Sequence, residues 1–179
     1  MQVTESQEKM VDAGGVVQAL ADDIAGTYVT FDLNGQNLGV EVRHVRAILD
    51  TTDVSQLPNA THEVEGVIDV RGESIPIIDI GSRLGMPRQS AGSDTRIIVF
   101  EFVSNGELRP VGILADRVRD VTEIAAEEIE SPPEIVGATW RGELLRGFAR
   151  HAGFLIMLLN AEAIFMPEGS GGASDLLTF

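Results

Sequence analysis

The sequence contains no cysteine, few aromatic residues and few basic residues. These scarcities limit both the functions and the kind of core that the chain can have. Without cysteine the chain has no disulfide, no thiol nucleophile and no cysteine-ligated metal. The 13 lysine and arginine residues are outnumbered by 28 aspartate and glutamate residues, and a net charge of -15 argues against binding to nucleic acid or to an anionic membrane surface. Aromatic residues make up 5% of the chain, so the core is expected to be aliphatic.

Hydrophobic runs long enough to cross a membrane are also missing. The longest aliphatic and aromatic run covers residues 154–159, far below the ~20 residues that a membrane-spanning helix needs. Residues 1–10 are polar and acidic and lack the basic-then-apolar pattern of a signal peptide. We therefore expect a cytoplasmic protein that does not insert into a membrane.

Residues that could catalyse a reaction or hold a cofactor are not grouped in a known motif. The histidines His44, His62 and His151 lie in separate segments without the spacing of metal ligands. No glycine-rich segment leads into Lys-Ser or Lys-Thr, and Ser74 and Ser82 lack a nucleophile-elbow motif. We predict a protein that is not an enzyme and that has no metal site and no cofactor.

The most informative stretch is a hairpin pattern over residues 66–80. Two runs rich in β-branched residues flank the polar sequence Arg71-Gly72-Glu73-Ser74. Glycine tolerates a positive φ, so this sequence predicts a tight turn that presents the Arg71 guanidinium. Two interpretations of Arg71 stay open, because its planar fork can bind a partner's carboxylate or form an internal ion pair with Asp69, Glu73 or Asp79.

Strand patterns recur along the rest of the chain. Alternating or β-branched runs, separated by turn residues, predict strands at residues 28–33, 38–42, 95–103, 111–115, 144–150 and 153–159. Asn34-Gly35 and Asn105-Gly106 are strong signals for hairpin turns. The chain is therefore expected to consist mainly of short strands joined by tight turns.

Two short helical segments are expected beside these strands. Val42, Val45, Ile48 and Leu49 have the spacing of one side of a helix, which predicts a short α- or 3₁₀-helical turn. This apolar stripe either packs in the core or receives a partner helix. Residues 160–165 are expected to form a closing helix with Asn160 as its N-cap.

The sequence also contains an internal repeat. When the chain is shifted along itself, a series of residues meets similar counterparts: Gly39 meets Gly112, Val45 meets Val118, Arg46 meets Arg119 and Ile48 meets Val121. A slightly longer shift aligns Gly66, Gly72 and Asp79 with Gly147, Gly153 and Asn160. An ordered series of matches predicts two copies of one small β unit.

Each copy has about five short strands with turns at regular intervals, which favours a small closed barrel. We expect an all-β fold of two pseudo-symmetric five-stranded barrels, packed together with a groove between them because ~65 residues form a marginal core alone. A single larger β-sandwich is the alternative. The expected organisation is an acidic leader (1–26), a first barrel (27–93), a second barrel (94–167) and a flexible tail (168–179).

The tail has an unusual end. A glycine- and serine-rich stretch leads into the apolar residues Leu176, Leu177 and Phe179. Two interpretations stay open: a tethered docking peptide, or a frayed terminus.

Several of these segments together form a family pattern: residues 28–33, Gly39-Val40-Glu41-Val42, Gly66-Val67-Ile68-Asp69-Val70-Arg71-Gly72, residues 95–99 and 111–118, Pro132-Pro133 and Gly147. On these segments, over about residues 27–165, the chain resembles the CheW-type chemotaxis coupling proteins. The family hairpin usually has Asn and Leu where this chain has Asp69 and Val70, and Val where it has Ala115. Asp69 adds a charge beside the turn, which could alter partner preference.

The resemblance implies a non-enzymatic adaptor made of two five-stranded SH3-like barrels. Family members couple chemoreceptors to the histidine kinase CheA, because they bind the CheA regulatory domain and the cytoplasmic hairpin tips of the receptors in membrane-associated arrays. Carried onto this chain, the resemblance implies a functional arginine at Arg71. It also implies an apolar groove between the barrels, lined by Val45, Ile48, Leu49, Val111, Ile113, Val118 and Val121.

Two related alternatives stay open, the coupling module of a CheV-type protein and that of a kinase regulatory domain. No receiver or kinase motif follows the second repeat, so we favour a separate adaptor. A small-barrel enzyme is less favoured, because it would need a convergent polar cluster that the sequence does not indicate.

Overall fold

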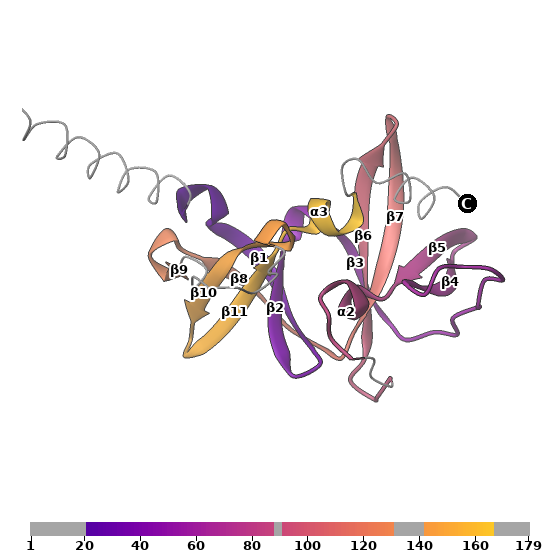
Figure 1. Cartoon of the computed structure of the whole chain (residues 1–179), viewed down its shortest axis with the longest axis horizontal. Coiled ribbons are helices and arrows are strands. Elements are labelled where there is room, and N and C mark those ends of the chain that lie inside the picture. Colours follow the sequence, from indigo (N-terminus) through magenta and orange to yellow (C-terminus); the bar gives the residue numbers. More distant parts are fainter. Residues whose placement is uncertain (1–20, 88–90, 131–141, 167–179) are drawn as a thin grey trace, which may run out of the picture.

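The computed structural model describes residues 21–87, 91–130 and 142–166, and these residues are mostly β-strand (Figure 1). The strands are β1 (Gly26–Leu33), β2 (Gln36–Glu41), β3 (Val45–Asp50), β4 (Val64–Val70), β5 (Glu73–Ile78), β6 (Arg96–Ser104), β7 (Glu107–Ala115), β8 (Arg117–Ile124), β9 (Ile129–Glu130), β10 (Leu145–His151) and β11 (Phe154–Leu159). The short helices are η1 (Val42–His44), α2 (Ile80–Arg83), η2 (Ala126–Glu128), η3 (Gly142–Leu144) and α3 (Ala161–Phe165).

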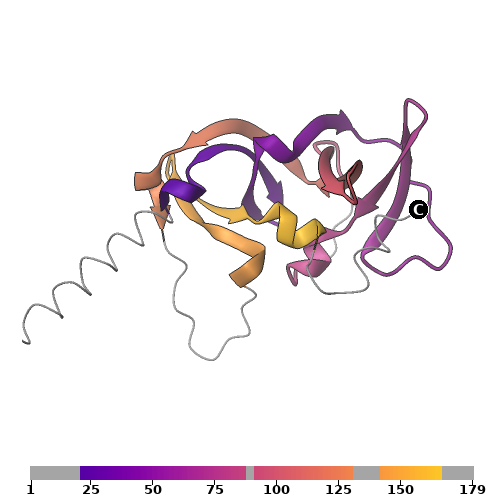
Figure 2. The ribbon, with the colours of Figure 1, turned by 90° about the horizontal axis from the view of Figure 1, so that it is seen from above.

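The strands form two sheets that pack together as two small barrels. Barrel I has the strand order β8-β1-β2-β11-β10-β9, and barrel II has the order β3-β6-β7-β5-β4. In both views α3 lies between the two barrels (Figure 1 and Figure 2). The predicted all-β fold of two packed barrels is thus confirmed, and barrel II has the five strands expected. Barrel I has six instead of five, because the two-residue strand β9 pairs with β10.

The barrels do not divide the chain where the repeat suggested. Barrel II takes β3, β4 and β5 from the first repeat but β6 and β7 from the second, while barrel I takes the β1–β2 hairpin and β8 to β11. The ranges 27–93 and 94–167 are therefore wrong as barrel boundaries. The reason is that η1 turns the chain out of barrel I directly after β2, and Asp116 carries it back from barrel II after β7.

The exchange of strands follows the same rule in both halves. The first hairpin of each repeat pairs with strands of the other repeat: β6 with β3 and β7 with β5, β1 with β8 and β2 with β11. In the parallel junctions Ile77 lies opposite Gly112 and Leu158 lies opposite Gly39, as the internal alignment requires. The two repeats are therefore interlocked and cannot be separated without breaking both barrels.

The ends of the repeats match equally well. The β4–β5 ladder has a bulge at Gly66 and the β10–β11 ladder has one at Gly147. Asp79 accepts a hydrogen bond from the Ser82 backbone N–H at 3.2 Å, and Asn160 accepts one from the Ala163 N–H at the same distance. The predicted N-cap at Asn160 is confirmed, and each repeat closes with a capped helical turn.

Three apolar clusters hold the fold together. One lies inside barrel I around Tyr28 and Leu158, and one lies inside barrel II around Ile77 and Ile97. The largest lies between the barrels and includes Phe31, Phe100, Ile113 and Phe165. Side chains along β6 alternate between the barrel II cluster and the central cluster, which explains why residues 95–103 form an almost continuous apolar run.

The two ends of the chain are described only in part. Residues 21–24 form a helical turn, and the Tyr28 hydroxyl donates a hydrogen bond to the carbonyl of Ile24 at 2.6 Å. The rest of the predicted leader, residues 1–20, and the predicted tail, residues 168–179, lie outside the described residues.

Candidate functional site

The central apolar cluster lies between the barrels, where the groove was expected. Val111 and Ile113 on β7 are completely buried there, so they present no atom to a partner and are removed from the expected groove. Val45 and Val118, which follow the two crossings between barrels, are partly buried against the same cluster. The pattern of valine and isoleucine residues indicated an apolar contact correctly, but it is a contact between the barrels.

The helical stripe expected around Val45 is mostly a strand. The 3₁₀ turn η1 ends at His44, and from Val45 to Asp50 the side chains alternate between the two faces of β3. Leu49 packs against the barrel II cluster, whereas Ile48 faces outward and is 41% exposed. The spacing of Val45, Ile48 and Leu49 fits a helix, but pairing of β3 with β6 decides for the strand.

Ile48 is part of a small surface on β3, which we call the β3 surface. Arg46 lies two residues before Ile48, and its Nη2 is 2.8 Å from Glu73 Oε2 on β5. Its Nη1 is 3.1 Å from Glu101 Oε2 on β6. These acidic partners raise the pKa of Arg46, so it stays charged and ties three strands of barrel II together beside the exposed isoleucine.

The second repeat builds a similar surface on β8, which we call the β8 surface. Arg119 Nε is 2.7 Å from Asp32 Oδ1 on β1, and its guanidinium lies over the Phe154 ring at 5.6 Å from the centroid. Val121, two residues further along β8, is 53% exposed. Both β3 and β8 pair with a strand on one side only, so each surface lies at the edge of its sheet.

Arg71 occupies the turn between β4 and β5, as the sequence predicted. Val70 and Glu73 form the last pair of the ladder, and Arg71 and Gly72 have φ values of 53° and 82°, the pattern of a two-residue hairpin turn with positive φ at both positions. Asp69 accepts a hydrogen bond from the Gly72 N–H at 2.8 Å.

The internal ion pair proposed for Arg71 does not form with its three candidate partners. Glu73 binds Arg46, Asp69 binds the turn backbone and Asp79 caps α2. Within the described ranges, Arg71 is exposed and forms no ion pair, and a role in binding a partner stays a prediction.

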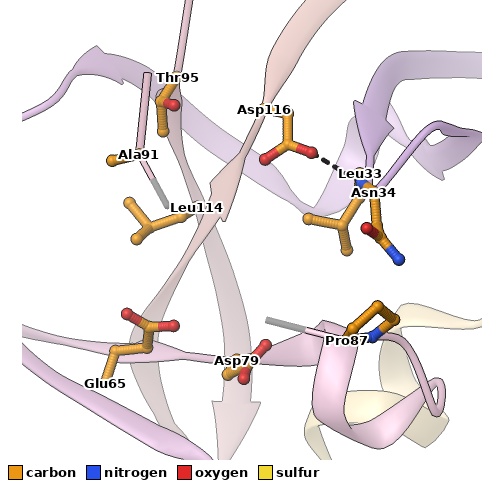
Figure 3. Close-up of a pocket in the computed structure, with 9 residues that line it drawn as sticks. All are labelled: Leu33, Asn34, Glu65, Asp79, Pro87, Ala91, Thr95, Leu114 and Asp116. Carbon is orange, nitrogen blue, oxygen red and sulfur yellow. Dashed lines mark hydrogen bonds between the residues drawn. The ribbon is translucent and has the colours of Figure 1, made fainter. Parts of the chain in front are cut away.

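A small pocket lies between the β1–β2 turn, β7 and the start of α2 (Figure 3). Its polar lining includes Asp116, whose Oδ2 accepts a hydrogen bond from the Asn34 N–H at 2.7 Å, and the carboxylates of Glu65 and Asp79. Within the part of the chain that the structure describes, no group of His, Cys, Asp and Glu side chains is arranged to hold a metal ion. Asp116 here fastens the first hairpin to the crossing after β7.

Two of the histidines have structural surroundings that the sequence did not indicate. His44 stacks on Phe102 with ring centroids 5.1 Å apart, and burial, assisted by Arg43, lowers its pKa against the opposing effect of Glu162. His151 lies between Glu128, 2.7 Å from its Nδ1, and the Thr122 hydroxyl, 3.0 Å from its Nε2.

The contacts of His151 close barrel I, because they fasten β10 to both η2 and β8. The pKa of Glu128 is lowered, first by the hydrogen bond from the Ala125 N–H and then by His151. The arrangement therefore has a direct role in holding the ends of the barrel I sheet together.

Sequence analysis missed four exposed apolar side chains: Val103 and Leu108 near the end of the β6–β7 hairpin, and Phe154 and Leu155 at the start of β11. Their exposure could have been predicted from their position next to the expected hairpin turns, because a large apolar side chain there has no core to enter. Phe154 belongs to the β8 surface through Arg119.

Comparison with known proteins gives one consistent result. The family model described as "CheW-like domain" matches residues 27–167. The chain is 30% identical over 140 residues to the chemotaxis protein CheW of Rhizobium meliloti, covering 78% of this chain and 87% of that protein. It is 28% identical over 140 residues to the chemotaxis protein CheW of Treponema pallidum, covering 78% and 82%.

A solved structure agrees with these relatives. The crystal structure of the scaffolding protein TtCheW from Thermoanaerobacter tengcongensis superposes with a TM-score of 0.68 at 26% identity, over 82% of this chain and 96% of that chain. Among the described residues, no helix is long and apolar enough to cross a membrane.

Proposed function

The chain belongs to the CheW-like domain family, and from this premise we propose that it is a non-enzymatic adaptor coupling chemoreceptors to the histidine kinase CheA. The observation that carries the proposal is the family match over both interlocked repeats. The proposed partners are the CheA regulatory domain and the cytoplasmic hairpin tips of chemoreceptors. The proposed location is a receptor array at the membrane.

The geometry supports an adaptor because it repeats one kind of surface. The β3 surface and the β8 surface each combine an arginine held by a carboxylate with an exposed aliphatic residue two positions later. Each lies on an edge strand of a different barrel. Two similar surfaces on one rigid body can hold two proteins in fixed register, and such a role needs no bond-making step.

The first test places a lysine on each surface in turn. In Ile48→Lys and Val121→Lys the new charge enters an exposed position, so the fold is expected to stay intact while the apolar contact with a partner is lost. Binding of each variant to purified CheA regulatory domain and to receptor cytoplasmic fragments is measured separately. We expect each variant to lose at least tenfold in affinity for one partner.

Each of the two variants serves as the control for the other, and far-UV circular dichroism checks that both are folded. Val45→Lys is a poorer probe, because Val45 packs against the central cluster and the substitution is expected to destabilise the protein. Unchanged affinity of both surface variants for both partners would remove the β3 and β8 surfaces from the proposal.

The second test concerns Arg71. Arg71→Asn removes the guanidinium but suits the turn, since Asn-Gly is the preferred sequence for this turn geometry. We expect the variant to keep the stability of the parent and to reduce kinase activation in a reconstituted array of receptor, kinase and adaptor. If activation equals that of the parent, Arg71 has no part in coupling.

A further inference from the structure

The β6–β7 hairpin carries the two most exposed large apolar side chains of the described residues. Val103 and Leu108 are 61% and 62% exposed, and they are direct cross-strand partners near the Asn105-Gly106 turn. Cross-strand partners project from the same face of a hairpin, so the two side chains form one apolar pair.

Among the described residues, no other strand pairs with the part of the hairpin that carries this pair. β3 pairs with β6 only as far as Phe100, and β5 pairs with β7 at Gly112 and Ile113. Beyond these points the hairpin projects from barrel II as a two-stranded ribbon (Figure 1). Both apolar side chains are therefore open to a segment that arrives from outside the barrel.

The chain itself continues from a point beside this hairpin. Phe165, near the end of α3, packs against Phe100 and Phe102 of β6 with ring centroids 5.0 and 5.4 Å apart. Met166 follows and packs against the same cluster. The chain then continues through residues 167–179, which lie outside the described part, so this segment starts next to the base of the ribbon.

Residues 167–179 combine a linker-like stretch with apolar residues that can cover the exposed pair. Residues 169–174 are glycine, serine and alanine, and the apolar residues after them are Leu176, Leu177 and Phe179. A flexible glycine-rich chain of ten residues spans roughly 16–19 Å on average, and neighbouring strands are about 5 Å apart. The linker can therefore bring these residues around one edge of the ribbon.

We propose that Leu176, Leu177 and Phe179 bind the Val103–Leu108 pair of the same molecule. The linker raises the local concentration of this apolar segment to the order of millimolar, so even a weak contact is populated without help from a second molecule. The segment covers the ribbon of barrel II and leaves the β3 and β8 surfaces open.

The absence of cysteine makes a direct test possible. In Ser104→Cys combined with Thr178→Cys, the two thiols are the only ones in the chain and neither replaces an apolar residue of the proposed contact. At micromolar protein the rate of intramolecular disulfide formation is followed by mass spectrometry and non-reducing gels. The matched control adds Val103→Ser and Leu108→Ser, which keep the linker and the thiols but remove the apolar pair.

We expect the control to form the intramolecular disulfide at least tenfold more slowly, and Leu176→Ser with Leu177→Ser in the parent cysteine pair to slow it equally. The second variant leaves every described residue other than the Ser104 cysteine unchanged, so it tests the contact independently of the stability of the ribbon. Equal rates in all three proteins would show a tethered segment without a binding site and would overturn the proposal. Disulfides that form only between molecules, at a rate that rises with concentration, would also overturn it.

Discussion

Among the described glycines, Gly66 is the position where an added methyl group is expected to be most destabilising. It lies at the bulge of β4 with a φ of 152°, and a Cβ built there would be 2.3 Å from the Ser55 carbonyl oxygen and 2.8 Å from Val54 Cγ1. The obstacle is backbone, which cannot rotate away as a side-chain end can. The segment at Ser55 is in turn held by two hydrogen bonds of 2.8 Å to Val67.

The cost of Gly66→Ala can be worked from these contacts. Moving the Ser55 segment breaks its two backbone hydrogen bonds with Val67, each worth about 0.5–1.5 kcal/mol net. The unusual φ adds roughly 1–3 kcal/mol for a residue with a side chain. We therefore expect the free energy of unfolding to fall by about 2–6 kcal/mol, a large part of the 5–15 kcal/mol that is typical of a domain.

The repeat supplies the matched control. Gly147 is the counterpart of Gly66 at the bulge of β10, but a Cβ there would meet Ile24, Glu130 and Ile129 at 3.5–3.8 Å, which is ordinary contact. We expect Gly147→Ala to change the free energy of unfolding by less than about 1 kcal/mol, because the loss of unfolded-state freedom offsets small adjustments.

Urea unfolding followed by far-UV circular dichroism measures both variants. With a slope of about 1–3 kcal/mol per molar urea, a loss of 3 kcal/mol moves the midpoint by roughly 1–3 M. A Gly66→Ala midpoint equal to that of the parent, or equal destabilisation of Gly147→Ala and Gly66→Ala, would refute the role of the Ser55 contact.

Two further outcomes test the N-cap of α3 and the partly buried His44. Asn160→Ala removes the N-cap of α3 and is expected to lower stability by about 1 kcal/mol in urea unfolding, whereas Asn160→Asp keeps an accepting oxygen and restores most of it. The lowered pKa of His44 means that the unfolded chain binds a proton more readily, so stability is complete above the unfolded pKa of about 6.5 and declines as the pH falls through that value. His44→Phe keeps the stacking on Phe102 but cannot titrate, and it should flatten the decline between pH 7 and 5; an identical pH profile would assign the decline to other groups.

Much of the local structure was predictable from short stretches of sequence. The Asn34-Gly35, Arg71-Gly72 and Asn105-Gly106 turns adopt the positive φ values that their residues favour. The order of matches between repeats also proved correct, because Gly39 and Gly112 each face a large side chain at the same parallel junction. These features depend on a few neighbouring residues, so local chemistry suffices to predict them.

The secondary structure of the apolar stripe after β2 could not be predicted from local sequence. Val45, Ile48 and Leu49 fit a helical spacing, yet β3 is a strand because β6 offers it a ladder. Likewise Val111 and Ile113 have the same residue types as Ile48 and Val121, but two are buried and two are exposed. Residue type indicates apolar contact, and only the packed arrangement decides whether that contact is internal.

The sequence by itself determined that the chain contains two copies of one β unit, where its turns lie and to which family it belongs. Only the tertiary structure decided which hairpin completes which barrel. The physical reason is the repeat itself: the two hairpins have equivalent strands and turns, so the sequence pattern fits pairing within a repeat and pairing between repeats equally well. The short crossings at η1 and Asp116 decide for exchange, and the central cluster then packs the two barrels into one body.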